Sequence, residues 1–321
     1  MDTITSSMTR EEIAALLGSG RLYSPGRDSL YTVDELMAGY ESDAPMQSLD
    51  ARLAAHVKAC GIPPADVDEA IAQVVHDQGV GQAMRAYVAA CVAQGRHIVG
   101  VMGAASTPRD APAYRLAAAT AKAVSEAGFL VATGGGLGIM EAGNLGAYFA
   151  GRPDEELYGA IDDLKRCPVY GGHEAQYIDS ARLITARRRA GAPSLAVATW
   201  RFDEEPISQF ATHIAKLFQN SVREEGLLSI ADAGVAYFQG GLGTLREVFQ
   251  DLAQNGAAEP AHQMAMVFVD IEAYGEPGSP FHLAHSRARR AAPPFDDLIT
   301  LADSPDAVVA AVTAARGRSD L

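Results

Sequence analysis

Short apolar runs, separated by glycine-rich turns and helical patterns, recur along the chain from residue 97 onward. The strand candidates span 97–103, 129–136, 194–200, 234–239, 264–270 and 298–303. A helical pattern at 114–128 ends in a glycine, and further helical patterns fill most of the other gaps. This alternation is typical of a parallel sheet that helices cover on both faces. The sequence therefore predicts an α/β fold, a Rossmann-like doubly wound parallel sheet that binds ligands beyond the carboxyl ends of its strands.

The first 95 residues have a different pattern. Segments 9–17, 48–60 and 64–77 each begin with a capping residue and acids and continue with apolar residues at helical spacing. We therefore predict a helical N-terminal extension at 1–95, serving as a cap or an oligomer-forming arm, ahead of a Rossmann-like domain at 96–321.

Charge and cysteine content exclude several classes of protein. The 321 residues include 40 acidic and 26 basic ones, a net charge of −14, whereas nucleic-acid binding requires a basic surface. The three cysteines form no CxxC pair and the eight histidines form no HExxH motif, so we expect no disulfide framework, no metal and no cofactor. No apolar run approaches the roughly 20 residues of a membrane span, and the N-terminus lacks the apolar core of a signal peptide. We expect a cytoplasmic protein that binds neither nucleic acid nor membrane.

Two glycine-rich loops follow predicted strands. The first, TGGGLGIMEAGNLGA (133–147), fails the GxGxxG pattern of dinucleotide sites because its third position is Glu141 or Ile139. The second, QGGLGTLRE (239–247), fails likewise at Arg246, and no GxxxxGK[ST] motif occurs. Both keep a strand, bare backbone and a helix start, an arrangement that directs free amides toward a phosphate. Either loop alone could serve only to turn the chain, but two on neighbouring strand ends favour a shared pocket for a mononucleotide.

The segments VGVMGAAST, GFLVATGGGLGIMEAGNLGA and VREEGLLSIADAGVAYFQGGLGTLREVF resemble three blocks of the Lonely-guy (LOG) family of phosphoribohydrolases, often mislabelled lysine decarboxylases. The resemblance covers roughly residues 97–255, and its most specific part is the GGxGTxxE block. The N-terminal helical region and the segment before this block look most like longer bacterial members akin to nucleotide 5′-monophosphate nucleosidases. The resemblance implies a nucleotide-binding catalytic domain.

Carried over by position, the resemblance implies a site. The 5′-phosphate of a nucleoside monophosphate would bind the loop Gly240, Gly241, Leu242, Gly243 and Thr244. Arg223 and Glu247 would act at the ribose and the glycosidic bond, and water would release the free base and ribose 5-phosphate. The resemblance also implies a homodimer or a higher homo-oligomer.

Two positions depart from the family pattern. Gln239 stands where the family usually has proline, and Glu224 stands where it commonly has lysine. The second change places a negative charge near a phosphate, which bears on affinity and substrate. A pyridoxal-dependent lysine decarboxylase is excluded because none of the four lysines, at positions 58, 122, 165 and 216, lies beside a glycine phosphate loop.

Glu247 and Arg223 each have a structural and a functional interpretation. Thr244 and Glu247 have the spacing of a capping box, while a carboxylate at this place could also stabilise a positive ribose or orient water. Arg223 is predicted on the polar flank of one long helix from Ile207 to about Ala231, beside Asn220 and Lys216. There its side chain is either exposed to solvent or donates several hydrogen bonds from its guanidinium group to the nucleotide.

Further nucleotide contacts are assigned to residues around the two loops: Ser106, Gly135, Gly136, Met140, Glu141, Glu205 and Asn220. Ser106 is equally a helix cap, Met140 suits core packing, Glu141 could face the pocket, and Glu205 is a weaker candidate for the base. The predicted activity is hydrolysis of AMP, another common nucleotide or a cytokinin riboside monophosphate. The alternative is a nucleotide-binding sensor or carrier of the same fold that does not cleave its ligand.

Overall fold

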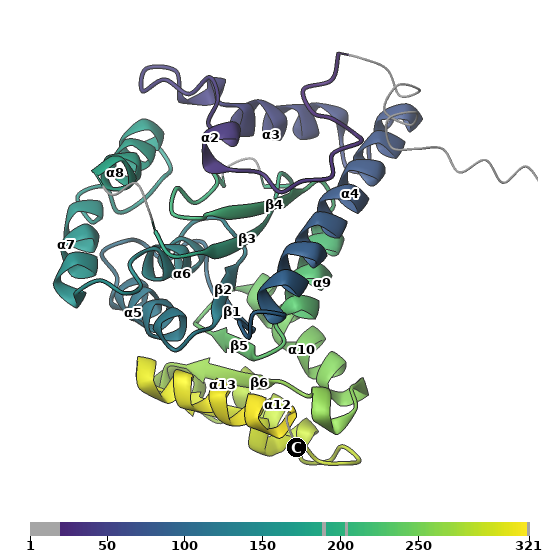
Figure 1. Cartoon of the computed structure of the whole chain (residues 1–321), viewed down its shortest axis with the longest axis vertical. Helices are drawn as coiled ribbons and strands as arrows, with labels where there is room; N and C mark the ends of the chain where they lie inside the picture. Colours follow the sequence, from purple (N-terminus) through teal and green to yellow (C-terminus); the bar gives the residue numbers. More distant parts are fainter. Residues whose placement is uncertain (1–19, 188–190, 203–204, 320–321) are drawn as a thin grey trace, which may run out of the picture.

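The computed structural model describes residues 20–187, 191–202 and 205–319. Its centre is a seven-stranded, all-parallel sheet in the order β4-β3-β2-β1-β5-β6-β7, with helices on both faces (Figure 1). The strands are β1 Ile98–Met102, β2 Leu130–Thr133, β3 Ser194–Thr199, β4 His213–Leu217, β5 Gly234–Tyr237, β6 Ala265–Val269 and β7 Ile299–Ala302. The predicted doubly wound fold is thus confirmed.

Strand order sets the place where a ligand can bind. The chain winds from β1 outward through β2, β3 and β4, and then returns to the other side of β1 with β5. The loops that leave β1 and β5 therefore diverge to opposite faces of the sheet. This divergence opens a crevice at the carboxyl ends of the central strands.

Helices on each side of the sheet bury its apolar faces. In Figure 1, α5 and α6 lie on one side, and α9 and α10 lie on the other. The α-helices of the described chain are α2 Val33–Leu36, α3 Leu49–Cys60, α4 Val67–Val92, α5 Pro112–Glu126, α6 Ile139–Tyr148, α7 Asp154–Leu164, α8 Glu174–Arg187, α9 Asn220–Ile230, α10 Leu242–Ala257, α11 Ile271–Tyr274, α12 Pro280–Ala288 and α13 Pro305–Ser319. Short 3₁₀ turns occupy Pro45–Gln47, Pro260–His262 and Asp296–Leu298.

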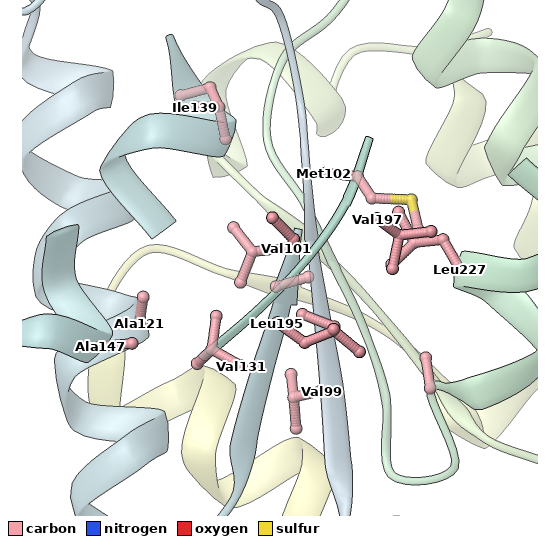
Figure 2. Packing of buried hydrophobic residues seen from close by; sticks show 14 of the residues in the cluster. Val99, Val101, Met102, Ala121, Val131, Ile139, Ala147, Leu195, Val197 and Leu227 are labelled. Carbon is pink, nitrogen blue, oxygen red and sulfur yellow. The ribbon is translucent and has the colours of Figure 1, made fainter. Parts of the chain in front are cut away.

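The core lies between the sheet and these helices. Figure 2 shows Val99 and Val101 of β1 near Val131 of β2, with Met102 and Leu227 meeting on another side. Helices α5 and α6 approach so closely that a Cβ at Gly146 would lie 1.9 Å from the carbonyl oxygen of Ala118. Because α6 is held this tightly, the turn that leads into it has a fixed position at the edge of the crevice.

The predicted helix over 207–231 is wrong. Residues 213–217 form β4, and the helix α9 begins only at Asn220. Four of the five residues of β4 are buried, so apolar residues occur on both faces of the strand and the spacing mimics a helix. Lys216 is not on a polar flank, because its ammonium group is buried in an ion pair with Asp50 of α3 at 2.5 Å.

The N-terminal helices pack on the edge of the sheet that ends in β4 (Figure 1). Helices α3 and α4 cover the segments predicted at 48–60 and 64–77, although α4 runs on to Val92. The helix predicted at 9–17 lies outside the described residues. The buried carboxylate of Asp77 in α4 accepts hydrogen bonds from the amides of Phe218 and Gln219 at 2.9 and 2.8 Å. The extension therefore supports the start of α9.

Among the described helices, none combines the length and the apolar character that crossing a membrane requires.

Candidate functional site

A cleft of about 470 Å³ lies at the carboxyl ends of the central strands, where the order of the strands in the sheet reverses between β1 and β5. Its walls come from the end of β1 (102–105), from Gly134 after β2, from α9 and from the first two turns of α10 (241–247). Met140, Phe202 and Glu205 complete the lining. The volume suits a small ligand of nucleotide size.

The second glycine loop leads into α10 at the mouth of this cleft. Helix α10 begins at Leu242, and no side chain caps its first turn. A Cβ at Gly241 or Gly243 would meet no atom within 4 Å, so packing inside the protein does not require glycine there. Gly240 differs, because a Cβ would lie 2.1 Å from the hydroxyl oxygen of Thr244. The loop therefore leaves open space above free helix amides, which is how helix starts accept anions.

The capping box is absent. Because α10 starts at Leu242, Thr244 is its third residue rather than its cap, and Glu247 lies one turn further inside the helix. The carboxylate of Glu247 instead accepts a hydrogen bond from the guanidinium of Arg223, with a nitrogen-to-oxygen distance of 3.1 Å. Both side chains are about nine-tenths buried and line the cleft. Of the two interpretations of Glu247, helix capping is thus removed.

Arg223 is held in the cleft from three sides. Its Nε donates to the carbonyl of Val197 in β3 at 2.9 Å, and a terminal nitrogen lies 3.8 Å from the sulfur of Met140. A Cβ at Gly134 would lie 1.9 Å from the guanidinium, so only glycine leaves room for it. Arg223 is therefore neither solvated nor on a polar flank, and its position is fixed before any ligand binds.

Burial changes the acidity of two carboxyls in the cleft. It raises the pKa of Glu247 above the ordinary value, and the neighbouring Arg223 only partly opposes this. Burial also raises the pKa of Glu205, again against the attraction of Arg223. Carboxyls with perturbed pKa values that share a cleft with a fixed cation are typical of functional sites.

Glu224, which departs from the family pattern, does not bring an unbalanced charge into the cleft. Its carboxylate forms an ion pair with the guanidinium of Arg246 and accepts a hydrogen bond from the side-chain amide of Asn220 at 2.8 Å. Both Glu224 and Arg246 line the cleft, while Asn220 stands behind them. The ion pair reduces the repulsion that a phosphate would otherwise meet there.

The first glycine loop contributes less to the cleft than the second. The two loops are not on neighbouring strand ends, because β1 lies between β2 and β5. Gly135 has a φ of +72°, and a Cβ there would lie 2.8 Å from that of Ala196. A Cβ at Gly136 would approach Met140 and Glu205 within about 3 Å. Neither glycine lines the cleft, so most of this loop serves close packing.

The remaining predicted residues divide between the cleft and its surroundings. Met140 and Glu205 line the cleft, whereas Ser106 faces a separate cavity of about 490 Å³ on the other side of the loop after β1. Glu141 is buried outside the cleft and accepts hydrogen bonds from Arg109, from the hydroxyl of Tyr114 at 2.9 Å and from that of Tyr177 at 2.7 Å. We therefore regard Glu141 as part of a structural network.

Several residues that line the cleft were not predicted as site residues, among them Arg246, Phe202 and Leu227. Arg246 lies in the quoted GGLGTLRE block, directly before Glu247, and its charge beside a phosphate loop was an available signal. Phe202 and Leu227 line the cleft as apolar surface, and no feature of the sequence distinguishes them from other apolar residues.

No protein-family model matches the chain, and no curated protein resembles it closely enough to count as a match. The fold and the cleft define an α/β protein with a nucleotide-sized site that holds a buried arginine–glutamate pair beside an uncapped helix start. The resemblance to the Lonely-guy blocks is therefore a hypothesis, and it rests on these residues alone.

Proposed function

We propose that the protein hydrolyses the N-glycosidic bond of a nucleoside 5′-monophosphate, releasing the free base and ribose 5-phosphate. The observation that carries the proposal is the buried pair of Arg223 and Glu247 in the cleft, next to the open start of α10. The cleft therefore contains both a place for a phosphate, at the start of α10, and a buried carboxylate, that of Glu247.

The phosphate end of the substrate is assigned to the second loop. The amides of the first turn of α10 have no partner within the helix, and Gly241 and Gly243 leave the space above them open. Arg246 adds a half-exposed guanidinium on the same side of the cleft. A phosphate placed here would receive backbone hydrogen bonds and a favourable helix dipole.

The sugar is assigned to the neighbourhood of Glu247. Cleavage of the glycosidic bond builds positive charge on C1′ and O4′ of the ribose, which an ionised carboxylate stabilises. Arg223 holds Glu247 in place through their hydrogen bond and favours the ionised form of the carboxyl, because it opposes the effect of burial. Water that attacks C1′ then supplies the hydroxyl of ribose 5-phosphate.

The base is assigned to the part of the cleft formed by Met140, Phe202 and Glu205. Phe202 offers an aromatic surface that is 45% exposed, and Met140 offers a polarisable thioether. Burial raises the pKa of Glu205 above its ordinary value. In its protonated form Glu205 can donate a hydrogen bond to a ring nitrogen of the departing base. These groups accept a purine such as that of AMP or a cytokinin riboside monophosphate.

A sensor or carrier that binds the nucleotide without cleaving it is the second candidate, because the same cleft would serve both. The presence of both Arg223 and Glu247 favours hydrolysis.

The three free cysteines fit a reducing compartment, and we propose the cytoplasm. We also propose a homodimer or higher homo-oligomer, since α9 and α10, which both line the cleft, expose the apolar side chains of Val222, Leu242 and Phe249.

The test is incubation with a panel of AMP, GMP, IMP, CMP and UMP, with adenosine as the unphosphorylated control. The proposal predicts that at least one monophosphate yields free base and that adenosine yields none. Binding of a monophosphate without release of base from any of them would favour the sensor or carrier instead.

A further inference from the structure

A cluster of three potential metal ligands lies in the N-terminal extension, away from the cleft. His56 and Cys60 stand one turn apart on α3, and Glu69 stands near the start of α4. A ligand atom from each side chain lies within 4.8 Å of the other two. The sequence predicts no metal, because its histidines and cysteines lack the spacing of a known metal motif, whereas these three residues meet only when α3 and α4 pack together.

The distances fit a metal of tetrahedral preference. The Nε2 of His56 lies 3.5 Å from the sulfur of Cys60 and 2.8 Å from a carboxylate oxygen of Glu69. Zinc binds a thiolate at about 2.3 Å and an imidazole at about 2.0 Å, so the two ligands of a tetrahedral site are separated by roughly 3.5 Å. The separation of Nε2 and the sulfur matches this distance, but the sulfur also lies 3.7 Å from Nδ1, so the imidazole must turn to direct Nε2 at an ion shared with Cys60. The carboxylate would move outward by about half an ångström to reach the same geometry.

Further side chains orient Glu69 as the outer shell of a metal site does. Its Oε1 also accepts hydrogen bonds from the hydroxyl of Tyr23 at 2.8 Å and from the amide of Gln73 at 3.0 Å. Arg21 contacts the other oxygen, Oε2, at 3.0 Å. Carboxylates that bind metals are commonly held by such hydrogen bonds. Arg21 therefore occupies Oε2, and a metal at Oε1 would replace the hydrogen bond from His56 while those from Tyr23 and Gln73 remain.

The local charge and exposure also favour a cation. The carboxylate of Glu69 lies within the cluster and attracts a divalent cation. The side chain of His56 is 27% exposed, so an ion can reach the cluster from solvent.

We propose that His56, Cys60 and Glu69 bind one Zn²⁺ ion, with water as the fourth ligand. A mixed thiolate, imidazole and carboxylate set suits zinc better than the hard cations calcium and magnesium. Binding releases the Cys60 proton to solvent, and the hydrogen that Nε2 of His56 donates to Glu69 moves to Nδ1, so that Nε2 can bind the ion. The ion then links α3 to α4. Since α4 carries the Asp77 side chain that supports the start of α9, the ion stabilises the extension and its contact with the sheet. The site is independent of the proposed hydrolysis.

The experiment is a titration of the chelator-treated full-length protein with Co²⁺, followed by displacement with Zn²⁺. We expect one equivalent of Co²⁺ to produce the near-ultraviolet charge-transfer absorption of thiolate ligation, and Zn²⁺ to abolish it. Zn²⁺ should also raise the melting temperature of the protein.

Two variants make the result specific. Cys60→Ser should lose the absorption and the thermal shift, and because Cys60 is partly exposed at the end of α3 this variant should fold. The matched control Cys167→Ser replaces a cysteine outside the cluster and should keep both signals. Absence of the absorption in the wild-type protein, or its survival in Cys60→Ser, would overturn the proposal.

Discussion

Replacing Glu247 with glutamine separates chemistry from structure in the cleft. Glutamine keeps an oxygen that can accept the 3.1 Å hydrogen bond from Arg223, but it removes the negative charge. The neutral acceptor weakens the contact with Arg223 by about 1 kcal/mol. An opposing effect comes from burial. The raised pKa of Glu247 means that the folded state holds the proton more tightly than the unfolded state, so ionisation of this group disfavours folding at neutral pH, and glutamine relieves that effect.

The free energy of unfolding of Glu247→Gln should therefore lie within about 1 kcal/mol of the wild-type value. Hydrolysis should fall at least about a hundredfold, equivalent to about 2.7 kcal/mol of lost transition-state stabilisation. The matched variant Glu247→Ala removes both the charge and the hydrogen-bond acceptor from the buried Arg223, at about 3 kcal/mol of stability. Urea unfolding and release of base from AMP measure the two effects. Wild-type turnover in a stable Glu247→Gln protein would refute the catalytic assignment.

Further predictions concern the ligand, the arginine and the assembly. AMP should bind at least about tenfold more tightly than adenosine in calorimetry, because charge-assisted hydrogen bonds to the phosphate contribute roughly 1.5–3 kcal/mol each; equal affinities would remove the phosphate assignment. Arg223→Lys keeps a positive charge for Glu247 but loses the several hydrogen-bond donors of the guanidinium, so turnover should fall more than tenfold. Its loss of stability should be smaller than that of Arg223→Ala. A fully active but unstable Arg223→Ala protein would show that the residue has a structural role. Sedimentation at micromolar concentration should show a dimer or larger assembly, because association would cover the exposed apolar side chains of α9 and α10. A monomer would contradict this.

The sequence predicted the strands that form separate short apolar runs. It placed β1, β2, β3, β5, β6 and β7 within a few residues of their observed bounds. It missed β4 because this strand is buried on both faces and its apolar residues continue into the pattern of α9. Only tertiary contacts, such as the ion pair of Lys216 with Asp50, distinguish the strand from a helix.

The environment of the candidate site was harder to predict than its residues. The spacing of Thr244 and Glu247 matches a capping box, yet α10 starts two residues before Thr244 because the glycine loop continues directly into the helix. The predicted helix over 207–231 placed Arg223 on a polar flank, but α9 begins only at Asn220 and Arg223 is buried. Its contacts with Val197 and Met140 join segments that are far apart in the chain. Such contacts depend on how the strands and helices pack, which the spacing of residues along the sequence does not predict.

The central claim is that the cleft cleaves the bond between ribose and base, and the products formed from AMP test it most directly. Wild-type protein should convert AMP into equal amounts of adenine and ribose 5-phosphate, measured by chromatography and mass spectrometry, and Glu247→Gln should form both at least about a hundredfold more slowly. Formation of adenosine and inorganic phosphate would show that the protein cleaves the phosphate ester instead. Equal rates of adenine release by the two proteins would contradict the role assigned to the cleft.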